Sequence, residues 1–222
     1  YFLVLFLSLL VIDFNINLGL LNETSYFYNI ILSGLFVFGF LKEYPHKRPF
    51  TILDIATGSA DQPIAVVKMA RKLRISVKIT AVDINRKMLN FAREETGQLP
   101  EIKFVQCDVL SLPFCEESFD LVVNSLSLHH FSRNNAVHII QSMDKLGRCG
   151  FIVNDLHRSW VAYCSIFLLT RLFTVNRLTR YDAPVSVMNA FMPSEMAEMA
   201  KEAGVDILVS GTTIFKENGG DL

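Results

Sequence analysis

From residue 50 onward, short apolar runs alternate regularly with amphipathic segments. The apolar runs are rich in β-branched residues and end at polar turns, as strands do, whereas the segments between them repeat apolar residues at helical spacing. The expected strands cover 51–55, 77–83, 102–107, 119–124 and 150–155, and the expected helices cover 62–74, 85–96 and 134–146. This alternation predicts βαβ units, so we expect an α/β fold with a Rossmann-like, mainly parallel twisted sheet and helices on both faces.

After the fifth expected strand the chain continues with further helical segments. A long helix is expected over 159–173, and 193–204 form another that begins with proline and serine and ends at glycine. Between them, the polar residues and the proline of 180–191 indicate a loop that could cover an active site. Residues 205–215 have strand character.

The first 49 residues have a different pattern. The apolar segment 1–12 is shorter than the roughly 20 residues that span a bilayer, and it has neither the basic start nor the small-residue cleavage site of a signal peptide. A truncated or atypical start is therefore favoured over a signal remnant. The segment 26–41 predicts a helix over the core or a ligand mouth, with peripheral membrane contact through 1–41 as the alternative. We divide the chain into an apolar N-terminal helical extension or lid, 1–49, and a Rossmann-like domain, 50–222.

Charge and cysteine content exclude several classes of function. The formal net charge is -1 and the basic residues are scattered, so no nucleic-acid partner is expected. The four cysteines form no C-x-x-C pair, which argues against both a metal site and a disulfide framework. A reducing cytoplasm fits this composition best.

Acidic residues lie at or just after the ends of three successive expected strands: Asp54, Asp83 and Asp108. Ligands of parallel sheets bind outside the carboxyl ends of the strands. Asp83 is suited to accept hydrogen bonds from both hydroxyls of a ribose, and Asp108 from an adenine amine, while Gly58 lets the backbone approach a ligand. The competing interpretation is that these acids are helix N-caps, which explains one of them more readily than all three.

The turn after the first expected strand, "ATGSADQP", distinguishes between nucleotide ligands. It has no G-x-G-x-x-G pattern for a pyrophosphate, and Asp61 would repel phosphate groups. A ligand that carries a sulfonium and an amino-acid tail would instead be favoured by acidic neighbours. The turn therefore argues against a dinucleotide.

In these residues the sequence resembles the class I S-adenosylmethionine-dependent methyltransferases, over about residues 50–210, and looks closest to the small-molecule enzymes of the ubiquinone and menaquinone type. Their first motif is acid-x-G-x-G-x-G, and Asp54, Gly58 and Asp83 match its acid, its middle glycine and the downstream ribose acid. Ala56 and Ala60 replace two of the motif's glycines, which leaves the turn less room.

The resemblance implies S-adenosyl-L-methionine as the cofactor and no metal. The residues expected to bind the cofactor are Asp54, Ala56, Gly58, Asp61, Asp83, Ile84, Asp108, Val109 and Asn124. The expected activity is methyl transfer to oxygen or carbon of a small aromatic or lipidic acceptor. The alternative is a degenerate, non-catalytic nucleotide-binding or scaffold protein of the same fold.

Two histidines are the candidate catalytic residues. His129 and His130 lie in "SLSLHHF", the loop after the fourth expected strand, and a base is needed only if the acceptor must lose a proton. Asp155 and His157 follow the fifth strand and map to the same rim. The alternative is structural, with one histidine packed inward to orient the loop and the other solvated.

Apolar residues suggest the chemistry of the acceptor. The segments 26–41 and 160–173 offer aromatic and aliphatic side chains to the cleft, although ordinary core packing of helices on a sheet is the favoured explanation. Four arginines could hold an acidic group of the acceptor or simply solvate a helix: Arg158, Arg171, Arg177 and Arg180. The expected partner is thus a small molecule, met in the cytoplasm or at a membrane surface.

Overall fold

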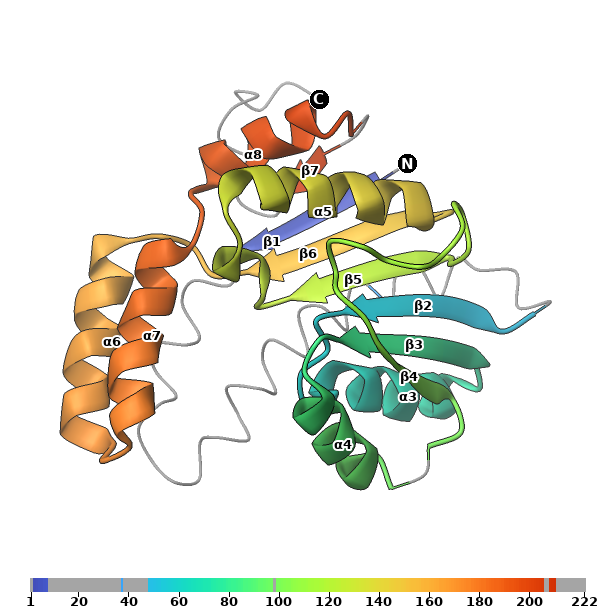
Figure 1. Cartoon of the computed structure of the whole chain (residues 1–222), viewed down its shortest axis with the longest axis horizontal. Helices are drawn as coiled ribbons and strands as arrows, with labels where there is room; N and C mark the ends of the chain where they lie inside the picture. Colours follow the sequence, from blue (N-terminus) through green and yellow to red (C-terminus); the bar gives the residue numbers. More distant parts are fainter. Residues whose placement is uncertain (1, 8–36, 38–47, 98, 206–207, 211–222) are drawn as a thin grey trace.

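A computed structural model describes residues 2–7, 37, 48–97, 99–205 and 208–210 of the 222-residue chain. The described strands form one seven-stranded sheet of order β4-β3-β2-β5-β6-β1-β7, in which every neighbouring pair is parallel (Figure 1). The strands are β1 (Phe2–Leu7), β2 (Phe50–Ile55), β3 (Val77–Asp83), β4 (Ile102–Gln106), β5 (Leu121–Ser125), β6 (Gly150–Asp155) and β7 (Leu208–Ser210). The predicted Rossmann-like α/β class is confirmed.

The strand order reverses between β2 and β5. The chain runs outward from β2 through β3 to β4 and then returns to β5 on the other side of β2. Their register pairs Ile52 with Leu121 and Ile55 with Asn124, so the two strands end together. The loops that follow them diverge at this point, which is where open α/β sheets bind ligands.

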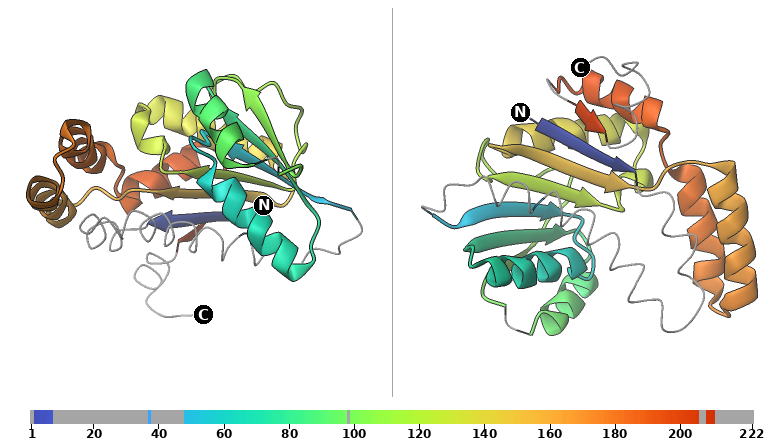
Figure 2. Two further views of the ribbon diagram at one scale, coloured as in Figure 1. Left: turned by 90° about the horizontal axis from the view of Figure 1, so that it is seen from below. Right: turned by 180° about the vertical axis from the view of Figure 1, so that it is seen from behind.

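The helices lie on both sides of the sheet. They are α3 (Asp61–Leu73), α4 (Arg86–Glu95), α5 (Arg133–Leu146), α6 (Trp160–Phe173), α7 (Arg177–Asn189) and α8 (Pro193–Glu202), with a short 3₁₀ helix, η1 (Leu128–His130). The apolar side chains of α3 pack on one face, whereas those of α5 and α8 pack on the other (Figures 1 and 2). None of the helices in the described part of the chain is long and apolar enough to cross a membrane.

The alternation of side chains along β2 explains how one strand serves both layers. Leu53 and Ile55 point into the core beneath α5 and α8, while Ile52 joins the core beneath α3. All three are at most 2% exposed. Full burial of each such side chain stabilises the fold by about 1.5–3 kcal/mol. The helices on both faces of the sheet therefore stabilise β2, the strand that carries Asp54.

The pair formed by α6 and α7 stands beyond the carboxyl ends of the strands (Figure 1). The two helices contact each other, and α7 also contacts η1. The prediction of a loop over 180–191 is wrong, because α7 extends to Asn189 with Pro184 inside it. Burial of Val187 against α6 stabilises this helix despite the proline, since tertiary packing provides most helical stability.

The N-terminal prediction of a helical extension fails for its first residues. Phe2–Leu7 form β1, which lies inside the sheet between β6 and β7. A short, unbroken apolar run is typical of a parallel strand, because both of its faces are covered, and periodicity alone does not distinguish it from a helix.

Most of the remaining N-terminal prediction lies outside the described residues, as does the predicted strand 205–215 apart from Val205 and β7. Val37 is described and buried, and it packs in the core beneath α3.

Candidate active site

A cleft of about 290 Å³ opens at the carboxyl ends of β2 and β5. Its walls come from the turn between β2 and α3, from the first turn of α4 and from the residues that follow β5. The lining residues are Asp54, Ala56, Thr57, Gly58, Ser59, Asp61, Gln62, Met88, Ser125 and Leu126. The cleft therefore lies at the reversal of strand order.

The turn between β2 and α3 adopts an unusual backbone conformation. Gly58 has a φ of 57° and open space where a side chain would stand, so its backbone is accessible to a ligand. Ala56 and Ala60 also have positive φ, at 56° and 64°. Of these two, only Ala56 lines the cleft, whereas the Ala60 side chain is completely buried. Ala60 thus affects the backbone of the turn rather than the room inside the cleft.

Asp83 links the glycine turn to the end of β3. Its Oδ2 accepts a hydrogen bond from the Gly58 backbone N–H at 2.9 Å, and its Oδ1 accepts one from Asn85 N–H at 2.8 Å. Asn85, not Asp83, is the N-cap of α4, so the capping interpretation of Asp83 is wrong. Each carboxylate oxygen can accept a further bond, which suits a pair of neighbouring hydroxyls.

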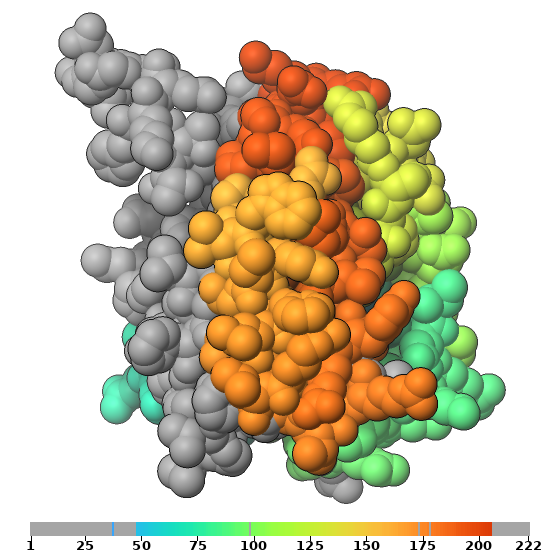
Figure 3. Space-filling view, turned by 90° about the vertical axis from the view of Figure 1, so that its left-hand side faces the viewer, coloured from blue at the N-terminus to red at the C-terminus, as the bar shows by residue number. Residues whose placement is uncertain are grey.

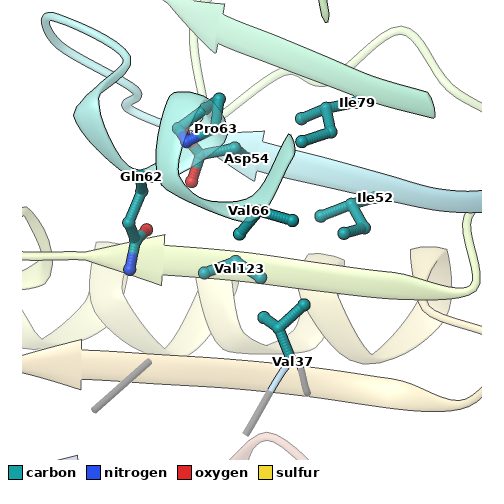
Figure 4. A pocket seen from close by; sticks show the side chains of 8 residues that line it. All are labelled: Val37, Ile52, Asp54, Gln62, Pro63, Val66, Ile79 and Val123. Atoms are coloured by element: carbon teal, nitrogen blue, oxygen red, sulfur yellow. The ribbon is translucent and has the colours of Figure 1, made fainter. Parts of the chain in front are cut away.

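Asp54 is the buried acid of the cleft. Only 4% of the residue is exposed, because α3 crosses it and Val66, Ile79 and Val123 lie close by (Figure 4). Burial raises the pKa of Asp54 to about 7; the negative charge of Asp83 also raises it, and the Thr57 hydroxyl acts in the opposite direction. The carboxyl group therefore changes charge near neutral pH.

Asp61 adds a third carboxyl group in the first turn of α3, where it accepts a hydrogen bond from the Ser59 hydroxyl. The described residues that line the cleft include no lysine or arginine. An acid-lined cleft without cations disfavours phosphates and favours a positively charged ligand.

Asp83 and the remaining predicted cofactor residues lie outside the lining set, although Asp83 bonds directly to the lining residue Gly58. Asp108 is exposed and its Oδ1 accepts from Leu110 N–H at 2.9 Å, which is a turn contact. Ile84 is exposed, whereas Val109 is buried in the core beneath α5. Asn124 is buried and donates to the Ser127 hydroxyl at 2.5 Å. Their roles toward the cofactor stay predictions.

Six lining residues were not predicted from the sequence: Thr57, Ser59, Gln62, Met88, Ser125 and Leu126. The signal available for Ser125 and Leu126 was their position at and directly after the end of β5, where ligands bind. Leu126 has a φ of 51°, which is strained for leucine, and such strain is concentrated at functional sites. Gln62 donates to the Ser125 hydroxyl at 2.8 Å and so joins α3 to β5.

His129 is held by Asp155 in the loop after β5. The Asp155 carboxylate accepts from the His129 backbone N–H at 2.7 Å and lies 2.5 Å from the ring nitrogen Nδ1. Both residues are buried. Because an ionised carboxylate can only accept, the proton between the two groups lies on Nδ1 of His129.

His130 is exposed, and its ring centroid lies 4.1 Å from that of His129. Partial burial lowers the pKa of His130, and the charge of His129 lowers it further, while Asp155 and Asp182 act in the opposite direction. A lowered pKa keeps the ring neutral, and able to accept a proton, at neutral pH.

Three further residues that the sequence suggested for the acceptor site make contacts within the protein itself. His157 pairs through its backbone with Phe191, ahead of α8. The Arg158 side chain donates to Glu195. Arg180 donates to the carbonyl oxygens of Thr170 and Thr174, and so supports the end of α6.

These features fit S-adenosylmethionine. Carboxyl groups of Asp54 and Asp61 suit a sulfonium and an ammonium group, Asp83 suits the ribose hydroxyls, and the open Gly58 backbone allows a close approach. The cofactor implied by the sequence thus agrees with the chemistry of the residues at the cleft.

Comparisons with known proteins lead to the same family. A methyltransferase domain family matches residues 52–150. The demethylmenaquinone methyltransferase of Thermotoga maritima is 26% identical, with 72% of each chain covered. A ubiquinone/menaquinone biosynthesis C-methyltransferase of Rickettsia bellii is also 26% identical, over 75% of this chain and 72% of its own length.

A solved structure shows the same fold. The plantazolicin methyltransferase BpumL, in complex with SAH, is 16% identical and superposes with a TM-score of 0.60 over 82% of this chain and 65% of its own. The sequence matches and the acid-lined cleft at the strand reversal agree on S-adenosylmethionine as the cofactor. The chain belongs to the class I S-adenosylmethionine-dependent methyltransferases.

Proposed function

We propose that this methyltransferase acts on the oxygen or carbon of a small aromatic or lipidic acceptor that loses a proton during transfer. The observation that carries the proposal is the pair of histidines, one fixed by a buried carboxylate and the other exposed beside it. The names of the relatives, which refer to menaquinone and ubiquinone, support a quinol-type acceptor. A phenol of this kind is a weak acid that benefits from a base.

The bound cofactor supplies a methyl group already activated on a sulfonium, so the residues of the chain chiefly bind, orient and deprotonate. In our proposal His130 is the base, because its ring is exposed and its pKa is lowered. The proton of the acceptor passes to a ring nitrogen of His130. Asp182, on α7, favours the charged ring that results.

His129 and Asp155 have a positioning role in this mechanism. The two bonds from Asp155 to the backbone and ring of His129 fix η1 relative to the end of β6. His130 is the next residue, so its ring is oriented through the same anchor. Fixing a base in this way reduces the entropic cost of reaching the reactive geometry.

The function is tested by incubation with a labelled methyl donor and a panel of phenols, quinols and short lipids. We expect labelled product with at least one class, and transfer to any of them excludes the non-catalytic alternative. If S-adenosylhomocysteine binds but no member of the panel is methylated, the proposed acceptor class is wrong while the cofactor assignment stands.

Acceptors of different acidity separate the two histidines. A phenol with a pKa near 10 is ionised in only about one molecule in a thousand at pH 7, and a general base contributes about a hundredfold to ten-thousandfold. His130→Ala should therefore lose more rate as the acceptor pKa rises, with cofactor affinity nearly unchanged. His129→Ala should show the same trend with a smaller loss, because it acts only through the orientation of His130. Wild-type rates in both variants would return both histidines to a structural role.

A further inference from the structure

The outer surface of α6 is apolar and uncovered. Figure 3 looks onto this side of the molecule, and α6 occupies its centre. The most exposed apolar side chains of α6 and the turn after it are 58–94% exposed: Trp160, Val161, Leu168, Leu172 and Val175. Within the helix, Val161, Leu168 and Leu172 are seven and four residues apart, and this spacing places them on one stripe.

The stripe on the opposite side of α6 already has its partner. Ala162, Ile166 and Thr170 are buried, and Ala162 and Ile166 pack against Val187 of α7. A surface helix in water normally carries polar residues opposite its packed stripe. In α6 that side is mostly leucine and valine, with Ser165 as a polar residue among them, while the polar Thr170 faces inward. A helix that is apolar on both sides requires a second apolar environment.

The charges around this stripe are predominantly positive. α6 contains no acidic residue, and its one basic residue, Arg171, lies with its guanidinium 3.5 Å from the centre of the Phe167 ring. Arg177 is exposed at the start of α7, and Asp182 is the acid of that helix. Apolar residues with aromatic and arginine neighbours are typical of helices that lie in the surface of an anionic membrane.

We propose that the outer stripe of α6 docks on the surface of an anionic lipid bilayer. The helix lies in the plane of the interface, with Leu168 and Leu172 inserted and the two arginines at the level of the headgroups. Because α6 stands beyond the carboxyl ends of the strands, docking places the edge of the sheet that carries the cleft toward the lipid (Figure 1). The proposal concerns attachment, and it is independent of the acceptor proposed above.

The sequence contains one tryptophan, so Trp160 is a built-in fluorescent probe of the docking surface. The full chain is mixed with vesicles of phosphatidylcholine alone or with phosphatidylglycerol added. We expect a blue shift of the emission and sedimentation with the anionic vesicles, several-fold stronger than with the neutral ones. The double variant L168S/L172S should lower vesicle partitioning at least tenfold, and R177Q should reduce the preference for anionic lipid.

The matched control is L73S, at an exposed leucine of α3 that is 39% exposed and belongs to another surface. It should bind vesicles like the wild type, and all variants should keep their affinity for S-adenosylhomocysteine, which shows that they fold. Emission and sedimentation that do not respond to either vesicle overturn the proposal. It is also overturned if the blue shift appears without lipid as protein concentration rises, together with a dimer in sedimentation velocity, because the stripe would then join two copies of the chain.

Discussion

Two aspartates are buried at opposite ends of the same sheet, and their surroundings differ. Asp120 lies just before β5, at the amino ends of the strands, and is completely buried. Asp54 lies near the carboxyl end of β2 and is 4% exposed. A buried charge is costly unless it is paired, so each site must either supply partners or change the charge.

Asp120 is supplied with partners. Arg48 donates to both of its carboxylate oxygens, at 2.5 and 2.9 Å, and Arg148 donates at 2.6 Å. The backbone N–H and the hydroxyl of Thr51 each add a bond at 2.9 Å. Burial by itself raises the pKa of Asp120, but the bonds from Arg48 and Thr51 outweigh it and the pKa lies below its usual value. This carboxylate is a structural anchor.

Asp54 has no such cation. In the part of the chain that the structure covers, no lysine or arginine forms an ion pair with it, and burial raises its pKa to about 7. Strongly shifted carboxyl groups in a cleft indicate a binding or catalytic site. The comparison shows that arginine side chains neutralise the buried Asp120 at the amino ends of the strands. Asp54, at the carboxyl ends, has no such partner among the described residues, so a positively charged ligand can take that position.

The largest expected effect is on the anchored carboxylate. Asp120→Asn removes the charge that holds Arg48 and Arg148, and we expect the free energy of unfolding to fall by about 3 kcal/mol, since breaking a buried pair typically costs about 3–5 kcal/mol and these arginines are partly exposed. Urea denaturation measures this. Glu101→Gln, in the exposed pair with Arg71, is the control and should cost less than about 1 kcal/mol. Equal losses in both variants would remove the distinction between the two sites.

The second prediction concerns the pH dependence of stability at Asp54. Its folded pKa, about 7, lies above the ordinary value of 3.8, so the folded state binds more protons between these values. The unfolding free energy should therefore fall as pH rises from about 4 to 7 and change little above that, as far as this group contributes. Asp54→Asn should remove this slope and stabilise the ligand-free protein near pH 8, where the wild-type carboxyl is buried and ionised. A variant less stable than the wild type at pH 8 would show that Asp54 has a stabilising partner after all.

The third prediction concerns the affinity for S-adenosylhomocysteine at the carboxyl ends of the strands. Asp83→Ala should weaken S-adenosylhomocysteine binding by about 1.5–3 kcal/mol, the worth of charge-assisted hydrogen bonds, as measured by calorimetry. Asp108→Ala is the informative companion, because the Asp108 carboxylate accepts from Leu110 in its own turn, whereas Asp83 accepts from Gly58, which lines the cleft. An equal loss there would extend the site to the end of β4. Binding of NAD in place of S-adenosylhomocysteine would contradict the cofactor assignment itself.

The sequence predicted what depends on local pattern. The strand ends at Asp54 and Asp83 follow from runs of β-branched residues, and parallel strands place both acids at one edge of the sheet. Contacts between distant segments were not predictable in this way. The pairing of β1 with β6, the bonds of Asp120 to Arg48 and Arg148, and the anchoring of His129 by Asp155 all depend on how the chain returns on itself.

The smallest effect separates the two alanines of the turn between β2 and α3. A left-handed conformation costs a residue other than glycine about 1–2 kcal/mol, while glycine costs about 0.5–1 kcal/mol in unfolded-chain entropy. Ala56 lines the cleft and is partly exposed, so Ala56→Gly should raise the unfolding free energy by up to about 1 kcal/mol. The Ala60 methyl is completely buried, and its removal loses about 0.8 kcal/mol of burial, so Ala60→Gly should be near neutral or slightly destabilising. Thermal unfolding of both variants measures the difference. If Ala56→Gly instead destabilises the protein by more than Ala60→Gly, then backbone strain does not govern the turn.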